Sequence, residues 1–495
     1  MTGNLSGSSH RETITNTAEN NPSAISAQAN QSKGMISEKD AWRALVALCV
    51  GFFMILLDQT IVAVATPDFQ SALNADYSQV LWVTSVYLLT YAVPLLVTGR
   101  LGDQIGPKNV YVAGMVVFTL SSLGCGLAPD IHWLIAARAV QGLGAALLTP
   151  QTMSVINRIF ARERRGAAMG LWGATAGMAG LAGPVLGGLL TTWIGWEWIF
   201  FVNVPIGVVS VIMVLKWVPQ LPTRNHGYDW GGIVTSVIAV FLLVFALQEG
   251  GNADWAPWIW IMIAASVVVF GIFIMIEKWG AQRGVEVLVP LSLFKDKNFS
   301  VGNISITTMG FAVAGPMVPI MIYFQQFHQM SALKAGLMMV PMALISGVLS
   351  PFVGRLSDTV PPRRLSLSGF TFMTVSMLCY FLVMKPDTSV WWMFVPIALQ
   401  GLGNAFVWAP NSTTTMRDLP MEKTGAGSGV YNTTRQVGSV IGSATVAATL
   451  DVFMQHTDPV SSLGWTMIFP AGVLLIGLVV VTQFQGTTAA TRGKK

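Results

Sequence analysis

Fourteen long apolar segments follow one another along this chain, and they constrain its fold more than any other feature. Each is roughly 18 to 25 residues long, the length of helix that crosses a ~30 Å hydrocarbon layer. Lipid offers the backbone no hydrogen-bond partner, so such segments are expected to be helices. The sequence therefore predicts an all-α polytopic membrane protein with fourteen transmembrane helices. The expected spans are 42–64, 79–98, 109–128, 132–156, 167–191, 198–218, 230–248, 257–276, 300–323, 333–353, 366–384, 391–411, 427–450 and 465–484.

The composition agrees with a membrane protein and argues against several other classes. Of the 495 residues, 53% are apolar and 10% are charged, which is more apolar sequence than a soluble core needs. Cys49, Cys125 and Cys379 lie inside apolar runs without ligand spacing, so we expect neither disulfides nor a metal site. The sequence pI is about 9.1, but the Lys and Arg residues are scattered through short loops, which argues against a nucleic-acid partner.

The basic residues predict how the chain is oriented. With the N-terminus in the cytoplasm, all but four of the 28 Lys and Arg residues fall on the cytoplasmic side. Lys334 and Lys385 fall outside, whereas Arg138 and Arg435 lie within spans. Because cytoplasmic loops carry an excess of Lys and Arg, we expect both termini to be cytoplasmic.

The first 38 residues differ from the rest of the chain. They are rich in Ser, Thr, Asn, Gln and Ala and have almost no large apolar residue, a composition that cannot form a packed core. The segment 1–38 also lacks the continuous apolar region of a signal peptide. We expect an uncleaved, disordered cytoplasmic tail, followed by a true first span.

An internal duplication divides the remainder. Gly99–Val110 reads GRLGDQIGPKNV and Gly354–Leu365 reads GRLSDTVPPRRL. The quartet Gln-Gly-Leu-Gly at 141–144 recurs at 400–403, and a small-residue run of the fifth expected helix recurs in the thirteenth. Three matches at nearly the same offset indicate two parallel halves, an architecture found among secondary transporters.

The duplication also accounts for the number of helices. Residues 39–222 are expected to form one six-helix repeat and residues 300–484 the other, followed by a basic tail at 485–495. The segment 223–299 then holds an inserted helix pair and a cytoplasmic loop. Within that loop, residues 285–297 are apolar and then basic, which suits either a surface helix or strap on the inner leaflet or an ordinary loop.

Motifs for other kinds of function are missing from the sequence. No G-x-x-x-x-G-K-[ST] motif occurs, which argues against an ATP-driven pump. The five histidines lie in the tail or near helix ends without H-E-x-x-H spacing, which argues against a membrane-embedded metal enzyme. No repeated filter sequence indicates a channel. We expect a carrier that is not an enzyme and uses no cofactor.

Asp58 is the only acid that we place deep within an expected span. A carboxylate there costs roughly 2.5 to 3.5 kcal/mol on insertion scales, so intramembrane acids usually face a cavity or a partner. Arg138 lies about six residues, or ~9 Å, below the outer end of its helix, and Asp58 lies at matching depth. We expect the two to pair and to couple transport to protons, the alternative being a purely structural ion pair. Gln141 follows one turn further along the face of Arg138.

Two of these stretches resemble motifs of the major facilitator superfamily. The sequence from Gly99 to Lys108 is similar to its signature loop between helices 2 and 3, with Gln104 and Pro107 where the family has basic residues. Leu57–Pro67, which contains Asp58, is similar to the family's first-helix motif. Within the superfamily, the chain resembles the fourteen-helix drug:proton antiporters over essentially the whole expected membrane region.

Further motifs support the same resemblance. Residues 138–144 match the fourth-helix motif with its buried Arg, and residues 183–188 resemble the antiporter signature of helix 5. Residues 195–205 and 432–438 resemble the outer connection before helix 6 and the pattern of helix 13. The resemblance and the turn chemistry together imply a gate that holds the outward-open state. Its expected residues are Gly99, Arg100, Asp103, Gly106, Lys108, Gly183, Pro184, Gly187, Gly188, Gly354, Arg355 and Asp358.

The substrate is less constrained by the sequence. The deep charges, one acid and two bases, do not demand a cation, and aromatic residues with the 25 methionines would suit an adaptable apolar cavity. The aromatic residues alternatively face lipid or core, and Arg435 alternatively joins an interior polar network. The expected cavity residues are Gln141, Tyr87, Tyr91, Trp172, Tyr323, Trp408 and Arg435, together with Trp82.

The resemblance implies a proton-coupled exporter of amphipathic drugs or dyes that works by alternating access. Its expected setting is the bilayer of the plasma (inner) membrane of a bacterium, where it would act as a monomer and draw on the proton gradient. An exporter or flippase of an amphipathic lipid, or an exporter of a dedicated metabolite, is the alternative among carriers. A membrane-embedded enzyme or a channel is the alternative from another class.

Overall fold

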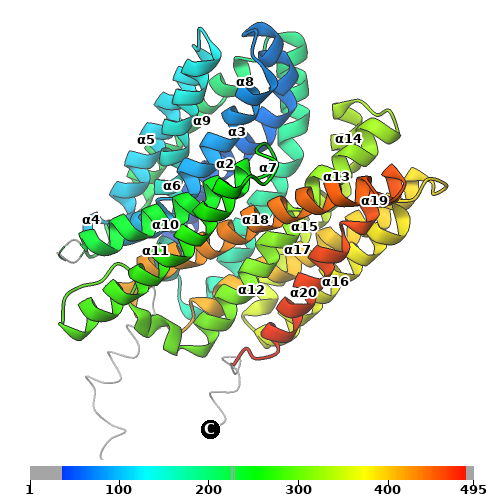
Figure 1. Cartoon of the computed structure of the whole chain (residues 1–495). Helices are drawn as coiled ribbons and strands as arrows, with labels where there is room; N and C mark the ends of the chain where they lie inside the picture. The colour runs from blue at the N-terminus through cyan, green and yellow to red at the C-terminus, as the bar shows by residue number, and fades with distance from the viewer. Residues whose placement is uncertain (1–35, 224–226, 228, 486–495) are drawn as a thin grey trace, which may run out of the picture.

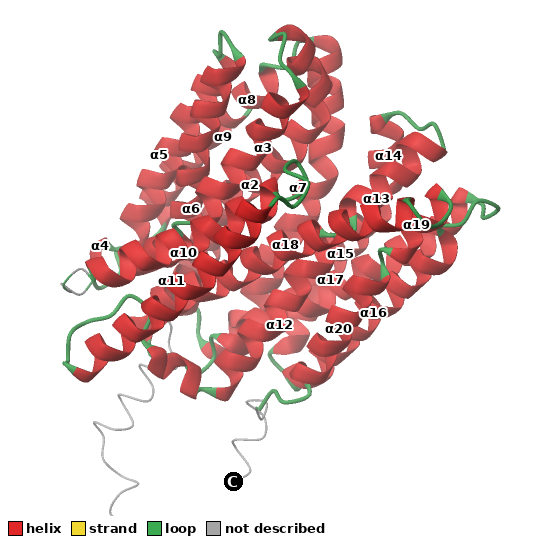
Figure 2. Cartoon of the chain, viewed as in Figure 1, coloured by secondary structure: helices red, strands yellow, loops and turns green. Residues whose placement is uncertain are grey.

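The computed structural model describes residues 36–223, 227 and 229–485, and every regular element within these residues is a helix. Figure 1 shows the blue-to-cyan helices in one bundle and the yellow-to-red helices in another, with the axes of the two bundles inclined to each other. The predominance of helix is plain in Figure 2. Most of the predicted tail at 1–38 and of the basic tail at 485–495 lies outside the described residues.

The first bundle is formed by the first half of the chain. Its elements are α2 (Glu38–Ala72), α3 (Tyr77–Ala92), α4 (Leu95–Ile105), α5 (Pro107–Gly126), α6 (Ile131–Ile159), the 3-10 turn η1 (Arg162–Arg164), α7 (Arg165–Trp193), α8 (Trp198–Phe201) and α9 (Asn203–Trp217).

The second bundle is preceded by an additional helix pair. The pair is α10 (Trp230–Glu249) and α11 (Pro257–Gln282), followed by the turn η2 (Leu291–Lys295). The second bundle comprises α12 (Lys297–Ala314), α13 (Met317–Ile322), the π-helical turn η3 (Tyr323–Phe327), α14 (Ala332–Met338), α15 (Val340–Ser357), α16 (Pro362–Val383), η4 (Val390–Met393), α17 (Phe394–Thr415), η5 (Met421–Lys423), α18 (Thr424–Met454), α19 (Pro459–Trp465) and α20 (Ile468–Val481).

The described residues confirm the expected fourteen spans. Thirteen helical stretches are each long and apolar enough to cross a membrane, and a bent pair supplies the fourteenth. The bent pair joins α3 to α4 at an angle of 47°. Pro94 lies at the break, where its ring cannot donate a backbone hydrogen bond and clashes with the preceding turn. The expected straight span at 79–98 is therefore a broken one.

Several helices extend beyond the predicted spans. α2 runs from Glu38 to Ala72, whereas the sequence predicted a span at 42–64. Hydropathy marks only the part of a helix that is apolar, and a helix continues until its backbone is capped. For the same reason α11 continues to Gln282, so that Glu277, placed in a loop by the sequence, is a fully buried helical residue.

The lower end of the molecule in Figure 1 holds both ends of the described chain. The side chains of Arg164 and Glu38 form an ion pair at the start of α2, and the Gln485 amide donates to the Asn298 side chain at the start of α12. We refer to this side as the lower end and to the opposite side as the upper end.

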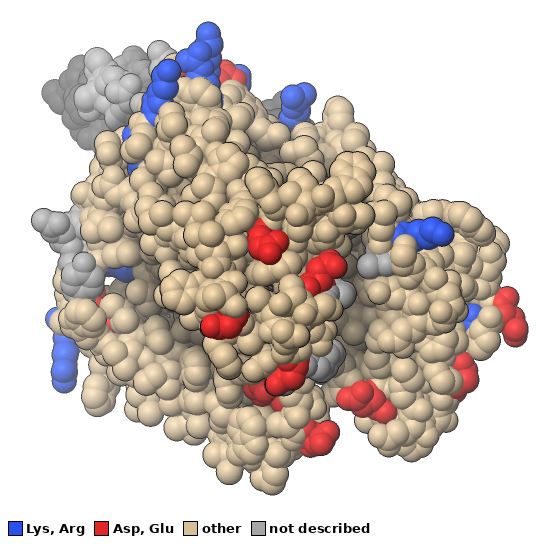
Figure 3. All heavy atoms as spheres, turned by 90° about the horizontal axis from the view of Figure 1, so that it is seen from above, with Lys and Arg blue, Asp and Glu red and all other residues tan. Residues whose placement is uncertain are grey.

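The upper end carries acidic side chains. Asp76, Asp130 and Asp458 accept hydrogen bonds from backbone N–H groups at the starts of α3, α6 and α19, where a carboxylate offsets the positive end of the helix dipole. Seen from above, this face shows scattered red acids with blue bases toward its rim, and it is furrowed beside the lobe at its right (Figure 3).

The inserted pair lies against both bundles through α10. Val240 and Val244 pack with Leu89 of α3 and Val440 of α18. By contrast, α11 packs mainly on α10, where Ser266 donates a 2.8 Å hydrogen bond to the Ala239 carbonyl. Most of the large apolar side chains of α11 are exposed, as expected of a helix that faces lipid.

Candidate functional site

A buried ion pair lies in the first bundle between α2 and α6. Arg138 Nη1 lies 2.5 Å from Asp58 Oδ2, and the two side chains are 1% and 0% exposed. Gln141 donates through Nε2 to Asp58 Oδ1 at 2.9 Å and accepts from Arg138 Nη1 at 2.7 Å. The predicted pairing of Asp58 with Arg138 thus agrees with the geometry, and Gln141, expected one turn further along the face of Arg138, contacts both. Both amide atoms of Gln141 are used here, although the sequence had placed the residue in a substrate cavity.

Asn203, at the first position of α9, completes the shell around the carboxylate. Its Nδ2 donates to Asp58 Oδ1 at 3.0 Å and to Ser122 Oγ at 3.0 Å, and Ser122 in turn donates to the Phe200 carbonyl. Sequence reasoning identified the stretch around Asn203 as an outer connection and gave the residue no role. An amide side chain inside an apolar segment was the available signal, because buried polar groups require partners.

Arg138 is enclosed by aromatic rings as well as by polar atoms. Its guanidinium carbon lies 4.1 Å from the ring centroid of Tyr87 and 5.9 Å from that of Phe200, and Nε donates to the Val83 carbonyl at 3.2 Å. A guanidinium stacked on rings gains electrostatic stabilisation that grows with desolvation. The pair is therefore sealed from solvent, and a proton on Asp58 would remove the charge that holds Arg138.

The predicted cavity residues fall into separate environments. Tyr87 stacks on Tyr91 with ring centroids 6.2 Å apart, and Trp172 stacks on Phe52 of α2 at 4.5 Å. Tyr323 is fully buried, with ring contacts to residues of its own segment. Trp82 packs on Phe245 of the inserted helix α10, at 5.8 Å.

Arg435 and Trp408 of the second bundle meet Tyr91 of the first. Arg435 Nη2 donates to the Tyr91 hydroxyl at 3.3 Å, and its guanidinium carbon lies 5.9 Å from the Trp408 ring centroid. The Tyr91 hydroxyl in turn donates a hydrogen bond to Thr149 Oγ1 at 3.1 Å. Of the residues predicted to line a cavity, these three are joined across the interface between the bundles.

Asp103 joins the two bundles at the lower end. Its carboxylate, at the end of α4, accepts from the backbone N–H groups of Gly425 and Ala426 at 3.1 and 3.0 Å. These groups open α18 of the second bundle, where the helix dipole favours an anion. Arg158 pairs with the same carboxylate from α6. Close approach is permitted because Gly99 lacks a Cβ, which would lie 2.6 Å from the Gly425 carbonyl oxygen.

Asp358 repeats this arrangement with the bundles exchanged. Following α15 of the second bundle, it accepts from the backbone N–H groups of Gly166 and Ala167 of α7 at 2.9 and 3.1 Å. A Cβ on Gly354 would lie 2.4 Å from the Gly166 carbonyl oxygen. Burial raises the pKa of the Asp358 carboxyl from its usual value to about 6, although its two backbone donors lower it. We call the contacts of Asp103 and Asp358 the two latches.

The helix 5 motif packs mainly within the first bundle. A Cβ on Gly183 would lie 2.0 Å from Thr60 Oγ1, and one on Gly187 would lie 3.1 Å from the Ile61 side chain, both on α2. A Cβ on Gly188 would lie 3.5 Å from Leu333 of α14, in the second bundle. The motif residues Gly183 and Gly187 thus bring α7 close to the helix that carries Asp58. Pro184 lies between them, within α7.

The remaining predicted gate residues make other contacts than the two latches. Arg100 pairs with Glu286 of the loop after α11 at 3.0 Å. Lys108 donates to the carbonyls of Leu215 and Val218 at 2.8 and 2.7 Å, which caps the C-terminus of α9. Gly106 has φ of +91° between α4 and α5, a conformation that glycine adopts without strain. Arg355 is exposed.

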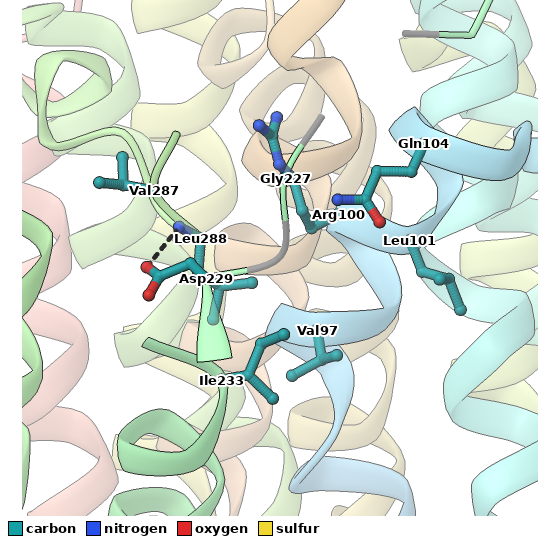
Figure 4. A pocket seen from close by; sticks show the side chains of 9 residues that line it. All are labelled: Val97, Arg100, Leu101, Gln104, Gly227, Asp229, Ile233, Val287 and Leu288. Atoms are coloured by element: carbon teal, nitrogen blue, oxygen red, sulfur yellow. Dashed lines mark hydrogen bonds between the residues drawn. The ribbon is translucent and has the colours of Figure 1, made fainter. Parts of the chain in front are cut away.

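The loop 283–296 connects the inserted pair to the signature loop. Figure 4 shows Arg100 and Gln104 of α4 across a small pocket from Asp229 and Leu288. The Leu288 backbone N–H donates to Asp229 Oδ2 at 3.2 Å, and the Val289 N–H donates to Glu277 Oε2 at 3.1 Å. This segment is a strap held by two carboxylates. Its only regular element is the five-residue 3-10 helix η2.

The comparisons with known proteins agree with the fold. The profile of the Major Facilitator Superfamily matches residues 48–443 and 300–492. An uncharacterized MFS-type transporter of Mycobacterium tuberculosis strain H37Rv is 46% identical over 83% of this chain and 70% of its own length. The multidrug resistance protein Stp of that species is 32% identical over 83% and 76%.

A riboflavin transporter and a solved structure complete the comparison. The riboflavin transporter RibZ of Clostridioides difficile is 29% identical over 91% of this chain and 99% of its own. The proton:xylose symporter XylE matches in structure with a TM-score of 0.65 at 11% identity, over 90% of this chain and 95% of that one. Two bundles, fourteen spans and the profile match lead to one conclusion: the chain is a transporter of the Major Facilitator Superfamily, a multi-pass membrane protein rather than an enzyme, with multidrug and antibiotic resistance proteins among its relatives.

Proposed function

We propose that the chain exports amphipathic drugs or dyes from the bacterial cytoplasm across the plasma membrane, in exchange for protons. The observation that carries this proposal is the fully buried Asp58–Arg138 pair in a carrier fold. Intramembrane acids mark proton and ion pathways more often than structural positions. The resistance proteins among the relatives support export as the direction and drugs as the substrate.

Protonation of Asp58 would change the forces within its shell. The ionised carboxylate accepts from Arg138, Gln141 and Asn203, and a proton would remove the charge that these donors share. Hydrogen bonds to charged groups contribute roughly twice as much as neutral ones. Proton binding would therefore loosen α2 from α6 and α9, which gives the proton a means of shifting the conformational equilibrium.

The proposal requires a conformation that is closed to the cytoplasm and open to the outside, and the two latches support it. They close the lower end, which is the cytoplasmic end in the orientation that the basic residues predict. A conformation closed there is the one that would take a proton from outside, and breaking the latches would open the other access. The gradient is sufficient, because one proton moving down 100 mV gains about 2.3 kcal/mol before any pH difference is added.

The direct test is dye accumulation by inverted membrane vesicles that contain this chain. A pH gradient that makes the vesicle lumen acidic should drive accumulation of ethidium or Hoechst 33342 in the lumen. A protonophore added midway should release the dye. Vesicles without the chain provide the background. Accumulation that ignores the protonophore, or that requires ATP, contradicts proton exchange.

A dedicated metabolite exporter is the second candidate. The likeness to a riboflavin transporter along nearly the full length of both chains favours it. Riboflavin should therefore be included in the same vesicle panel. A strict preference for riboflavin over every dye would replace the drug assignment, while leaving the proton coupling to its own test.

A further inference from the structure

Arg435 carries a charge that its surroundings do not neutralise. It is partly buried in the middle of α18, and within the described residues no carboxylate forms an ion pair with it. Its Nη2 donates only to the neutral Tyr91 hydroxyl, and its Nε is buried without a partner. Arg138, the other guanidinium deep in a span, is paired with an acid. Even a partly buried cation without a counter-charge is costly, which points to a charge partner from outside the chain.

None of the three carboxylates described so far, those of the proton pair and of the two latches, is free to pair with Arg435. Asp58, the acid placed deep within a span, is occupied by three side-chain donors in its own bundle. Asp103 and Asp358 lie at the lower end and are occupied by the latches. To pair with Arg435, any of these carboxylates would have to give up the hydrogen bonds that it makes now.

The groups around Arg435 are suited to an aromatic molecule. The Trp408 ring lies under the guanidinium, and Tyr91 approaches it from the first bundle. Gly173 of α7 lies beside the base of the Trp408 side chain: a Cβ on Gly173 would lie 3.6 Å from Ser350 Oγ and 4.0 Å from Trp408 Cβ. The Ser350 hydroxyl is also buried without a partner. Helices of both bundles thus meet around one cation and one indole.

We propose that Arg435 is the anchor for the anionic group of the substrate, and that this transporter prefers aromatic amphiphiles that bear a carboxylate or similar acid. The proposal rests on the proposed export function and narrows its substrate class. The planar guanidinium presents a fork of donors that matches a carboxylate, which an ammonium does not. Trp408 and Tyr91 then contact the rings of the same molecule.

The position of the anchor also ties substrate to the movement of the bundles. Arg435 belongs to the second bundle and its one hydrogen-bond partner, Tyr91, to the first. Tyr91 stacks on Tyr87, which in turn covers Arg138 of the proton pair. An anion that draws Arg435 away from Tyr91 acts on a chain of contacts that ends at Asp58.

The experiment measures equilibrium binding to the purified full-length protein. Three pyrene probes share one ring system and differ in charge: 1-pyrenebutyrate, 1-pyrenebutanol and a pyrenebutyl trimethylammonium salt. Binding is followed by pyrene fluorescence for the wild type, Arg435→Gln and Arg435→Lys. Arg283→Gln is the matched control, since Arg283 also lies over an indole, that of Trp279, at 5.7 Å and outside the bundles.

The wild type should bind the carboxylate at least ~10-fold more tightly than the alcohol, because a hydrogen bond to a charged group is at stake. Arg435→Gln should abolish that preference and leave affinity for the alcohol within about twofold. Arg435→Lys should keep part of the preference, and Arg283→Gln all of it. Retained folding is checked by thermal unfolding of each variant.

Equal or tighter binding of the alcohol or the cation by the wild type overturns the proposal, as does a preference that survives in Arg435→Gln. Binding of none of the three probes also overturns it. Each of these results leaves the export function to the protonophore test, because that test uses cationic dyes and a proton gradient. A clear carboxylate preference, together with no proton-driven accumulation of 1-pyrenebutyrate itself in the vesicles, would instead refute the coupling and retain the anchor.

Discussion

The two halves of the molecule each have a glutamine at the corresponding position, but the two side chains have different hydrogen-bond partners. In the first half, Gln141 lies between Asp58 and Arg138 and bonds both. In the second half, the corresponding Gln400 accepts a 3.0 Å hydrogen bond from the Tyr380 hydroxyl. Both glutamines are buried, and both follow the same Gln-Gly-Leu-Gly sequence. One glutamine thus belongs to an ionic network and the other to a neutral contact.

The difference shows that the two halves share their packing contacts but carry different charged groups. Each half contributes one aspartate latch and one glycine-lined approach to the other half, which a gate between similar bundles requires. The titratable pair occurs in the first bundle, whereas the second bundle carries the cation at the interface. In our proposals the proton therefore binds in the first half and the anionic group of the substrate in the second, so that relative movement of the halves would connect the two.

Removing the carboxylate of the first half should have the largest effect. Asp58→Asn is expected to reduce proton-driven transport to background, because no carboxylate remains in the shell to bind the proton. It also leaves Arg138 buried without its counter-charge, which costs about 3 to 5 kcal/mol. The double variant Asp58→Asn with Arg138→Gln should regain thermal stability without regaining transport. Wild-type transport by the double variant would place the coupling elsewhere.

Removing the glutamines tests the comparison directly. Gln141→Leu should cost more than Gln400→Leu, because hydrogen bonds to charged groups contribute about 1.5 to 3 kcal/mol and neutral ones about 0.5 to 1.5. Gln141→Leu should also slow proton-driven uptake, whereas Gln400→Leu should affect stability alone. Thermal unfolding and vesicle uptake measure the two effects. Equal losses of transport from both variants would make the halves equivalent in coupling.

The two latches should differ in strength. Asp103 is paired with buried Arg158 as well as with the α18 amides, so Asp103→Asn should favour opening of the lower end more than Asp358→Asn. A loss of about 1.4 kcal/mol would increase the open population about tenfold. A reporter Ser154→Cys in a background without native cysteines measures opening, since Ser154 is buried against the second bundle. Unchanged labelling in both variants would contradict the latches.

The smallest expected effect is a pH dependence from Asp358. Its carboxyl pKa is raised by burial to about 6, from an ordinary value of 3.8. The folded state therefore binds this proton more tightly than the unfolded state, and stability from this group is lost as pH rises between those values. The melting temperature of the wild type should fall, by a few degrees at most, relative to Asp358→Asn between pH 4.5 and 6.5. Parallel curves would contradict the assignment.

The sequence sufficed for much of the fold because lipid imposes a simple rule. Long apolar runs must be helices, so fourteen spans and the duplicated halves were predictable. Asp58 and Arg138 were also predictable, since charge in such a run is costly and requires a partner. The proline at the break between α3 and α4, Pro94, is evident in the sequence. Hydropathy averaged over a window of residues does not reveal the break.

The remaining contacts depend on which face of a helix meets which neighbour. Tyr91, Tyr323 and Trp82 occur in similar apolar sequence, but one reaches Arg435, one packs within its own segment and one contacts α10. Hydrophobic periodicity cannot separate these environments when lipid, core and interface are all apolar. Glu277 was misplaced for a related reason, because a charge near the end of an apolar run resembles a boundary.

The exposed helix α11 fixes how deep the molecule sits in its bilayer. Trp260 and Trp279 are both exposed and lie 19 positions apart in sequence, which at 1.5 Å per residue is about 28 Å along the helix. Indole rings favour the headgroup level, so two such rings measure the hydrocarbon thickness. In a thinner bilayer, tilting α11 relieves the hydrophobic mismatch, and its packing on α10 would transmit that tilt to α3 and α18. Lipid chain length thereby becomes a variable of this transporter.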